Sequence, residues 1–222
     1  MKKKSFYAGI LLTSAVMVLG STGVVYAADN TSATGYPQYD EILNRYYNGI
    51  SQHWGIAEFQ DDGLCYVAGY TTDVSKLGYY LKDIDSDGVE ELLIGAIEDE
   101  YYTGMIYDFY TILNGKLVQV VSSGERDRYY LCKDDKIANE GSGGALNSAF
   151  NYYEYESGKL KKLETVFTDG FYDEQNPWFY TTADSLDDHS TPITEEVGRS
   201  IISKYEYAEI PFTSLAELQQ GR

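Results

Sequence analysis

The feature that most constrains the fold is a succession of strand-like runs separated by short turns between residues 64 and 167. Three turns are explicit: Asn114-Gly115, Asp134-Asp135 and Ser157-Gly158 suit hairpins that need a positive φ or an Asx bend. Sequential hairpins make each strand pair with the next in antiparallel orientation. The sequence therefore predicts an antiparallel meander of about six to eight strands. The candidate strands are residues 64–70, 78–82, 91–97, 105–113, 116–122, 128–133, 150–156 and 159–167.

One helix is predicted near each end of this meander. Apolar residues recur at spacings of three and four from Ile42 to Ile50, and the preceding Asp40 favours the positive end of a helix dipole. Near the other end, Thr194 is expected to cap a helix that begins at Glu195 and carries an apolar stripe. Together with the meander, these helices predict an α+β fold.

Three further segments constrain the packing. Residues 92–97 are continuously apolar, which predicts a strand buried on both faces and covered by the helices. The Gly-rich segment 140–145 is predicted to be a flexible turn, since no Lys-Ser/Thr follows it to make a phosphate loop. Residues 168–192 are polar and contain Pro177, and we expect a long irregular loop there.

The N-terminal segment predicts export. Three Lys at positions 2–4 precede an apolar run at residues 6–25, and small residues flank a cut after Ala27. This order is typical of a secretory signal peptide. An N-terminal membrane anchor is the alternative, although Gly, Ser and Thr dilute the run. We expect a signal peptide at 1–27, a linker at 28–36 and a single secreted domain at 37–222.

The charge balance excludes several partners. The 222 residues include 35 Asp+Glu against 17 Lys+Arg, a formal charge of −18. Phosphate backbones and anionic lipids would repel such a chain, so neither nucleic acid nor a membrane surface is an expected partner. The acids gather in segments 83–115 and 163–198, each with nine acids and no Lys or Arg. Only the first segment has an evident chemical reason for its charge.

That reason is an acidic motif at residues 83–95. Asp83, Asp85 and Asp87 alternate along the chain, so their carboxylates converge if it curls, and Gly88 permits the tight bend. The positions that follow can add a backbone carbonyl and a further carboxylate. Calcium prefers many hard oxygens in a flexible anionic pocket, whereas magnesium demands stricter octahedral geometry. A solvated acidic turn without an ion is the alternative.

The motif resembles the strand-loop-strand calcium loops of integrin-type FG-GAP and VCBS repeats, and single-copy versions in uncharacterised secreted proteins of Gram-positive gut bacteria. An EF-hand loop would need a Glu where this chain has Ile94, and a helix on either side. FG-GAP propellers repeat the motif, whereas this chain carries it once, so a full propeller is not expected. The resemblance implies calcium ligation by the side chains of Asp83, Asp85, Asp87 and Glu91 and by the carbonyl of Val89.

The two cysteines leave two interpretations open. An oxidising compartment permits a disulfide between Cys65 and Cys132. Both residues lie in strand-like runs, where buried free thiols are the alternative. A catalytic Cys would need a nearby His, and neither His53 nor His189 belongs to a recognisable motif.

No catalytic constellation is evident in the sequence. We therefore expect a secreted, non-catalytic binding or interaction domain with one structural calcium ion and an extracellular glycan or protein as partner. The alternative is a secreted hydrolase or glycan-binding module that uses the loop at 168–192, where Trp178 and Tyr180 could stack on sugar rings.

Overall fold

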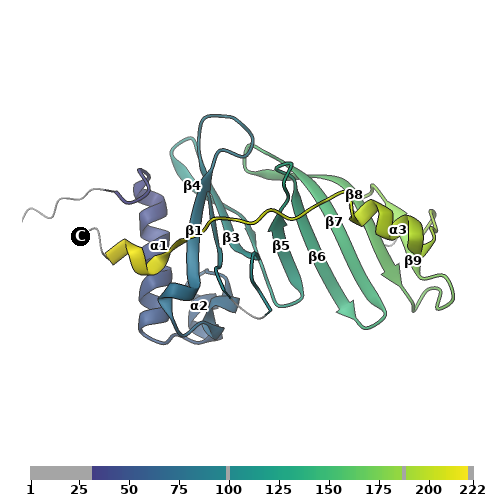
Figure 1. The fold of residues 1–222 in the computed structure, drawn as a ribbon, viewed down its shortest axis with the longest axis horizontal. Coiled ribbons are helices and arrows are strands. Elements are labelled where there is room, and N and C mark those ends of the chain that lie inside the picture. The colour runs from purple at the N-terminus through teal and green to yellow at the C-terminus, as the bar shows by residue number, and fades with distance from the viewer. Residues whose placement is uncertain (1–31, 99–100, 187–188, 220–222) are drawn as a thin grey trace, which may run out of the picture. The chain divides into compact units, whose positions relative to one another are not determined.

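The computed structural model describes residues 32–98, 101–186 and 189–219. The predicted signal peptide, its cleavage after Ala27 and residues 28–31 of the linker lie outside these residues. In the described part, ten strands form one sheet with antiparallel pairing between neighbouring strands (Figure 1). The strands are β1 (Leu77–Lys82), β2 (Glu91–Ala96), β3 (Ile106–Leu113), β4 (Lys116–Ser122), β5 (Asp127–Leu131), β6 (Ile137–Gly144), β7 (Asn147–Glu156), β8 (Lys159–Asp169), β9 (Trp178–Thr181) and β10 (Thr213–Ser214).

The strand order confirms an antiparallel meander. β1, β2 and β3 are neighbours in chain order, as are β5 to β9, while β4 pairs with β3 and β10 returns to the outer edge of β1. The predicted turns contain residues with positive φ: Asn114, Gly115, Asp135, Ser157 and Gly158. The ten strands of this sheet exceed the six to eight expected, because no strand-like run of the sequence marks β6, β9 or β10.

Three α-helices accompany the sheet among the described residues. The two expected ones are α1 (Pro37–Ser51) and α3 (Glu195–Ile202), and α2 (Ile56–Asp61) was not anticipated. Thr194 caps α3 as predicted, because its hydroxyl accepts a hydrogen bond from the Val197 N–H at 3.3 Å. Three 3₁₀ helices complete the elements: η1 (Tyr66–Tyr70), η2 (Val74–Lys76) and η3 (Leu215–Gln219).

The predicted strand at residues 64–70 is wrong, because most of it is the 3₁₀ helix η1. Gly69 lets the start of α2 lie against this turn, since a Cβ there would come within 2.6 Å of the Ile56 nitrogen. The apolar side chains that suggested a strand, among them Leu64 and Val67, fill the core beside α1 instead. Tertiary packing overrides the local β-propensity here.

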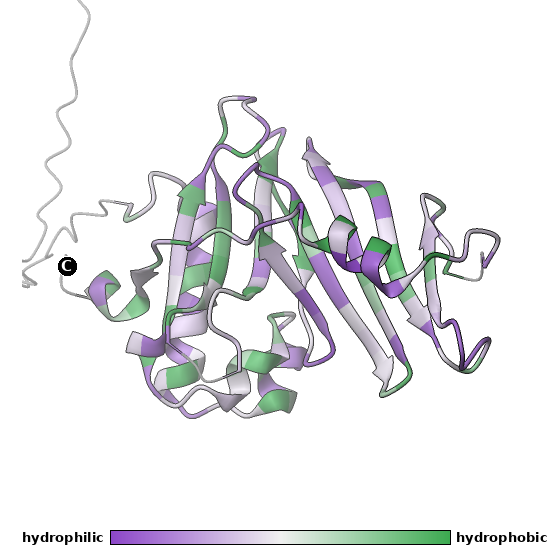
Figure 2. Cartoon of the chain, turned by 45° about the vertical axis from the view of Figure 1, so that its right-hand side comes forward, coloured by the Kyte–Doolittle hydropathy of each residue, from purple (hydrophilic) through white to green (hydrophobic). Residues whose placement is uncertain are grey.

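β2 is buried along its whole length, as its apolar run predicts. On one face, Leu92 and Ile94 belong to the core that α1 and α2 cover, and Figure 2 shows hydrophobic segments in these helices and in the adjacent strands. On the other face, Leu93 packs in a second cluster with Ile210 and Phe212. The expectation that helices cover both faces is therefore half right. The chain that follows α3 closes the second face, and α3 itself contacts β8 and β9.

Two segments expected to be irregular contain strands. The Gly-rich segment 140–145 lies largely within β6, and the expected loop at 168–192 contains the end of β8 and all of β9. Asn139, Asn151 and Thr165 are buried and hydrogen-bond in series across β6, β7 and β8. Because a buried Asn and three Gly stand where apolar residues would alternate, no such pattern marks β6 as a strand.

Cys65 and Cys132 are buried free thiols, so the disulfide is not formed. The Cys65 Sγ donates a hydrogen bond to the Ser123 carbonyl at 3.3 Å, whereas Cys132 packs with Tyr152 in a separate cluster. Burial raises the pKa of both thiols, that of Cys132 to about 12. Thiols in such surroundings stay protonated at neutral pH and are poor nucleophiles.

Candidate metal centre

The acidic loop joins two paired strands. Lys82 at the end of β1 lies opposite Glu91 at the start of β2. The loop is therefore flanked by strands, as the sequence predicts, and not by the helices of an EF-hand. Ser86 and Gly88 take φ values of 61° and 90° inside it. Glycine adopts such a conformation without strain, which confirms the role predicted for Gly88.

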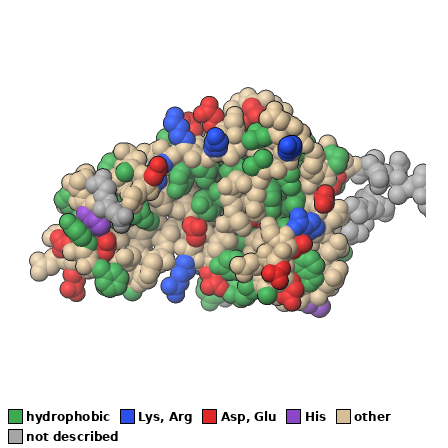
Figure 3. Space-filling view, turned by 180° about the vertical axis from the view of Figure 1, so that it is seen from behind, with side chains coloured by type: hydrophobic (Ala, Val, Ile, Leu, Met, Phe, Trp, Pro, Cys, Tyr) green, Lys and Arg blue, Asp and Glu red, His purple; other side chains and the backbone are tan. Residues whose placement is uncertain are grey.

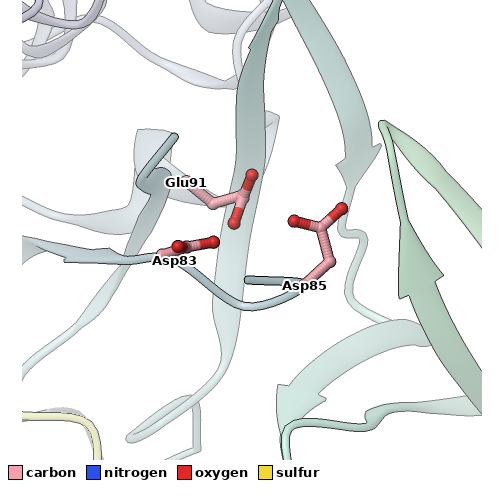
Figure 4. Close-up of side chains that lie close together, drawn as sticks. All are labelled: Asp83, Asp85 and Glu91. Atoms are coloured by element: carbon pink, nitrogen blue, oxygen red, sulfur yellow. The ribbon is translucent and has the colours of Figure 1, made fainter. Parts of the chain in front are cut away.

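Three carboxylates meet in this loop. One oxygen from each of Asp83, Asp85 and Glu91 lies within 4.8 Å of the other two. Figure 4 shows the three side chains pointing toward one another. Carboxylates at this spacing repel unless a proton or a cation compensates them. Such a set of hard oxygen ligands fits a metal ion such as calcium or magnesium.

Glu91 is the buried member of the cluster, with no exposed surface. Its Oε2 accepts a hydrogen bond from the Ile84 N–H at 2.9 Å. Its Oε1 accepts two, from the Thr111 hydroxyl at 3.0 Å and the Tyr155 hydroxyl at 3.1 Å. Burial raises the pKa of Glu91, these hydrogen bonds oppose the rise, and the nearby Asp85 carboxylate adds to it. The side chain is thereby held in one orientation.

Asp83 and Asp85 shape the loop around this buried group. The Asp83 carboxylate accepts hydrogen bonds from the N–H groups of Asp87 at 3.1 Å and Gly88 at 3.0 Å, which curls the chain. The Asp85 Oδ2 accepts a hydrogen bond from the Ser157 N–H at 2.6 Å. Its Oδ1 is buried and has no hydrogen-bond partner. Buried carboxylate oxygens are normally satisfied, so this oxygen needs a cation or a donor.

Asp87, the fourth predicted side-chain ligand, does not join the cluster. The Asp87 Oδ1 accepts a hydrogen bond from the Val89 N–H at 2.8 Å, which folds the second half of the loop. The structure thus brings together three of the four predicted side-chain ligands. Asp87 lies in the same loop but outside the group that could hold a metal ion.

Sequence reasoning missed the residues that support the site from a distance. Thr111 on β3, Tyr155 on β7 and Ser157 in the β7–β8 turn all hydrogen-bond to its carboxylates. The Tyr39 hydroxyl on α1 donates to the Glu90 carbonyl at 2.9 Å. Because these contacts span 20 to 72 positions along the chain, no local pattern could have revealed them.

Trp178 and Tyr180, the predicted sugar-stacking residues, lie on β9 and are half buried. Gly198 on α3 lies directly over Trp178, since a Cβ there would come within 2.6 Å of the indole ring. The Arg199 guanidinium lies 5.6 Å from the centre of that ring. Trp178 is therefore covered by α3 and does not form an exposed platform for a sugar ring.

Comparisons of this chain with protein-family models, with curated proteins and with solved structures give no match. No helix in the described ranges is both long and apolar enough to cross a membrane. The geometry of the site therefore carries the functional argument.

Proposed function

We propose that the chain is a secreted, non-catalytic protein whose acidic loop binds one structural calcium ion. The observation that carries the proposal is the convergence of Asp83, Asp85 and Glu91 on one point, where the buried Asp85 Oδ1 has no partner. A cation at this point would satisfy that oxygen and remove the repulsion among the carboxylates. The charged start and apolar run of residues 1–27 support export.

The hydrogen bonds indicate how each residue would contribute. A carboxylate has about four lone-pair positions. Glu91 uses two on Oε1 and one on Oε2, which leaves one position on Oε2. Glu91 would therefore bind calcium through a single oxygen. Asp83 and Asp85 would supply further oxygens, and a small rearrangement of the loop would add the Asp87 carboxylate and the Val89 carbonyl.

Calcium suits this site better than magnesium. The loop offers several flexible oxygen ligands, and calcium accepts six to eight of them in irregular geometry, whereas magnesium requires a regular octahedron and retains water. Extracellular calcium sites commonly bind at about 10⁻⁴ to 10⁻³ M. A site of this affinity is filled outside the cell and nearly empty inside, so folding is coupled to export.

The structural role follows from what the loop contacts. Asp85 accepts a hydrogen bond from Ser157 in the β7–β8 turn, and Glu91 accepts one from Tyr155 on β7. The backbone carbonyl of Glu90, at the end of the loop, accepts one from Tyr39 on α1. A bound ion would fix these carboxylates and join three parts of the chain that are distant in sequence.

The test is calorimetry of residues 28–222 in chelator, calcium and magnesium. A ligand at 100 times its dissociation constant stabilises the folded state by about 2.7 kcal/mol. For a chain of this size, the melting temperature then rises by about 5 to 11 °C. The proposal requires calcium to raise it more than magnesium at equal concentration, and an identical melt in chelator and in calcium would contradict it.

A further inference from the structure

A second candidate site lies on the face of the sheet opposite α3. Trp178 and its cross-strand partner Thr168 face α3, so Phe167 and Asp169 at alternate positions face the other way. On that side, β5 to β8 line a cavity of about 450 Å³. The volume lies within the range of roughly 300–1,000 Å³ that is typical of small-molecule sites.

The floor of the cavity is a chain of hydrogen bonds that all run in one direction. The Thr165 hydroxyl donates to Asn151 at 2.8 Å, Asn151 donates to Asn139 at 2.9 Å, and Asn139 donates to the Asp127 carboxylate at 2.5 Å. Such a chain polarises its members toward the terminal carboxylate. Asp127 is exposed at the end of the chain. Asn147 also lines the cavity, and its buried Oδ1 accepts no hydrogen bond.

The charge of the lining selects against anions. Two carboxylates, Asp127 and Asp169, line the cavity together with three Asn side chains, and its lining contains no Lys or Arg. In Figure 3, which views the molecule from behind, acidic, apolar and His side chains gather at the end of this face that holds β8 and β9. The acid-rich segment 163–198 contributes the wall at Asp169.

Exposed aromatic rings lie next to this wall. The Asp169 Oδ1 accepts hydrogen bonds from the N–H groups of Phe171 and Tyr172, so it holds the turn that presents both rings. Phe171 is 78% exposed and Tyr172 is 65% exposed. The Tyr172 ring stacks on His189 at 3.9 Å, and the His189 Nε2 lies 3.0 Å from the Asp169 Oδ2. The aromatic turn is thereby anchored to the polar cavity.

We propose that this cavity binds a neutral oligosaccharide. Sugar hydroxyls both donate and accept, which matches a lining of amides, carboxylates and hydroxyls, whereas an ammonium ion only donates and so can pair with the acceptors of the lining alone. The apolar face of a sugar ring can rest on an exposed aromatic ring such as Phe171, as aromatic side chains combine apolar area with a defined orientation. This site is separate from the calcium loop and does not depend on it.

The experiment is ligand-observed NMR followed by calorimetry, on residues 28–222 in calcium buffer. The probes are neutral trisaccharides of glucose, xylose and N-acetylglucosamine, with trigalacturonate as the anion and spermidine as the cation. Gly141 lies between Asp127 and Ala149 across the strands, and a Cβ there would meet only Ala149, at 3.8 Å or more. Gly141→Val therefore adds three carbon atoms to the wall of the cavity without removing any side-chain hydrogen bond. Asp127→Asn removes the terminal charge, and Asp134→Asn, on an exposed residue outside the cavity, is the matched control.

We expect at least one neutral trisaccharide to bind and both charged probes to fail. Asp127→Asn should weaken binding at least about tenfold, since a hydrogen bond to a charged carboxylate is replaced by a weaker one to a neutral amide. Gly141→Val should abolish binding, and Asp134→Asn should leave it unchanged. Three results would overturn the proposal: no neutral trisaccharide binds the folded protein, spermidine binds in their place, or Gly141→Val binds as well as the wild type.

Discussion

Asp85→Asn separates the electrostatic cost of the acidic cluster from its metal-binding role. The Asn oxygen can still accept the hydrogen bond from the Ser157 N–H, so only the charge is removed. Two unit charges 4.8 Å apart repel by about 3.5 kcal/mol at an effective dielectric constant of 20. Asp85 is partly exposed, and solvent and salt reduce this repulsion to about 1 to 2 kcal/mol.

The sign of the effect therefore depends on calcium. In chelator, Asp85→Asn should raise the melting temperature by about 2 to 8 °C, because repulsion with Glu91 and Asp83 disappears. In calcium at 100 times the dissociation constant, the free energy of unfolding of the wild type rises by about 2.7 kcal/mol. That of the variant rises less, because a neutral amide is a weaker calcium ligand than a carboxylate. The order of the two melting temperatures should reverse between the two buffers.

Differential scanning calorimetry in both buffers measures this reversal. Asp134→Asn is the control, because it removes the same charge from an exposed residue outside the cluster. If Asp85→Asn lowers the melting temperature equally in chelator and in calcium, Asp85 acts only through its contact with the β7–β8 turn, and the metal-site reasoning is refuted.

Three further predictions concern the core. Burial raises the pKa of Asp108, although hydrogen bonds from Tyr46 and other donors oppose the rise, so the folded state keeps this proton to higher pH than the unfolded chain. The stability of the wild type relative to Asp108→Asn, measured by urea unfolding, should therefore fall as pH rises through this raised pKa. Thiol titration should find two reactive cysteines per chain in denaturant and almost none in the native protein, and a loss of both thiols in denaturant would reveal a disulfide. Gly95→Ala should destabilise the protein by about 1 to 3 kcal/mol in the same urea assay, because its Cβ would lie 2.5 Å from the Phe212 ring; an unchanged midpoint would contradict this packing.

The parts of the fold that the sequence predicted are those encoded locally. Asn114-Gly115 and Ser157-Gly158 have the positive φ angles that their residue types suggest, and the strands beside them follow. The mistakes concern segments whose structure depends on distant partners. Residues 66–70 form a 3₁₀ helix on which α2 packs at Gly69. The buried Asn139 of β6 finds its polar partner, Asn151, on β7, and β9 is a strand through its pairing with residues 165–168 of β8.

The same division applies to the candidate site. The spacing of Asp83 and Asp85 and the positive φ of Gly88 are properties of consecutive residues, so the sequence by itself determines that the loop curls and brings these two carboxylates together. Only the tertiary structure decides which carboxylate is buried and which oxygen is left without a partner. Glu91 is oriented by Thr111 and Tyr155, which lie 20 and 64 positions away in the chain, and such contacts exist only once the sheet has closed around the loop.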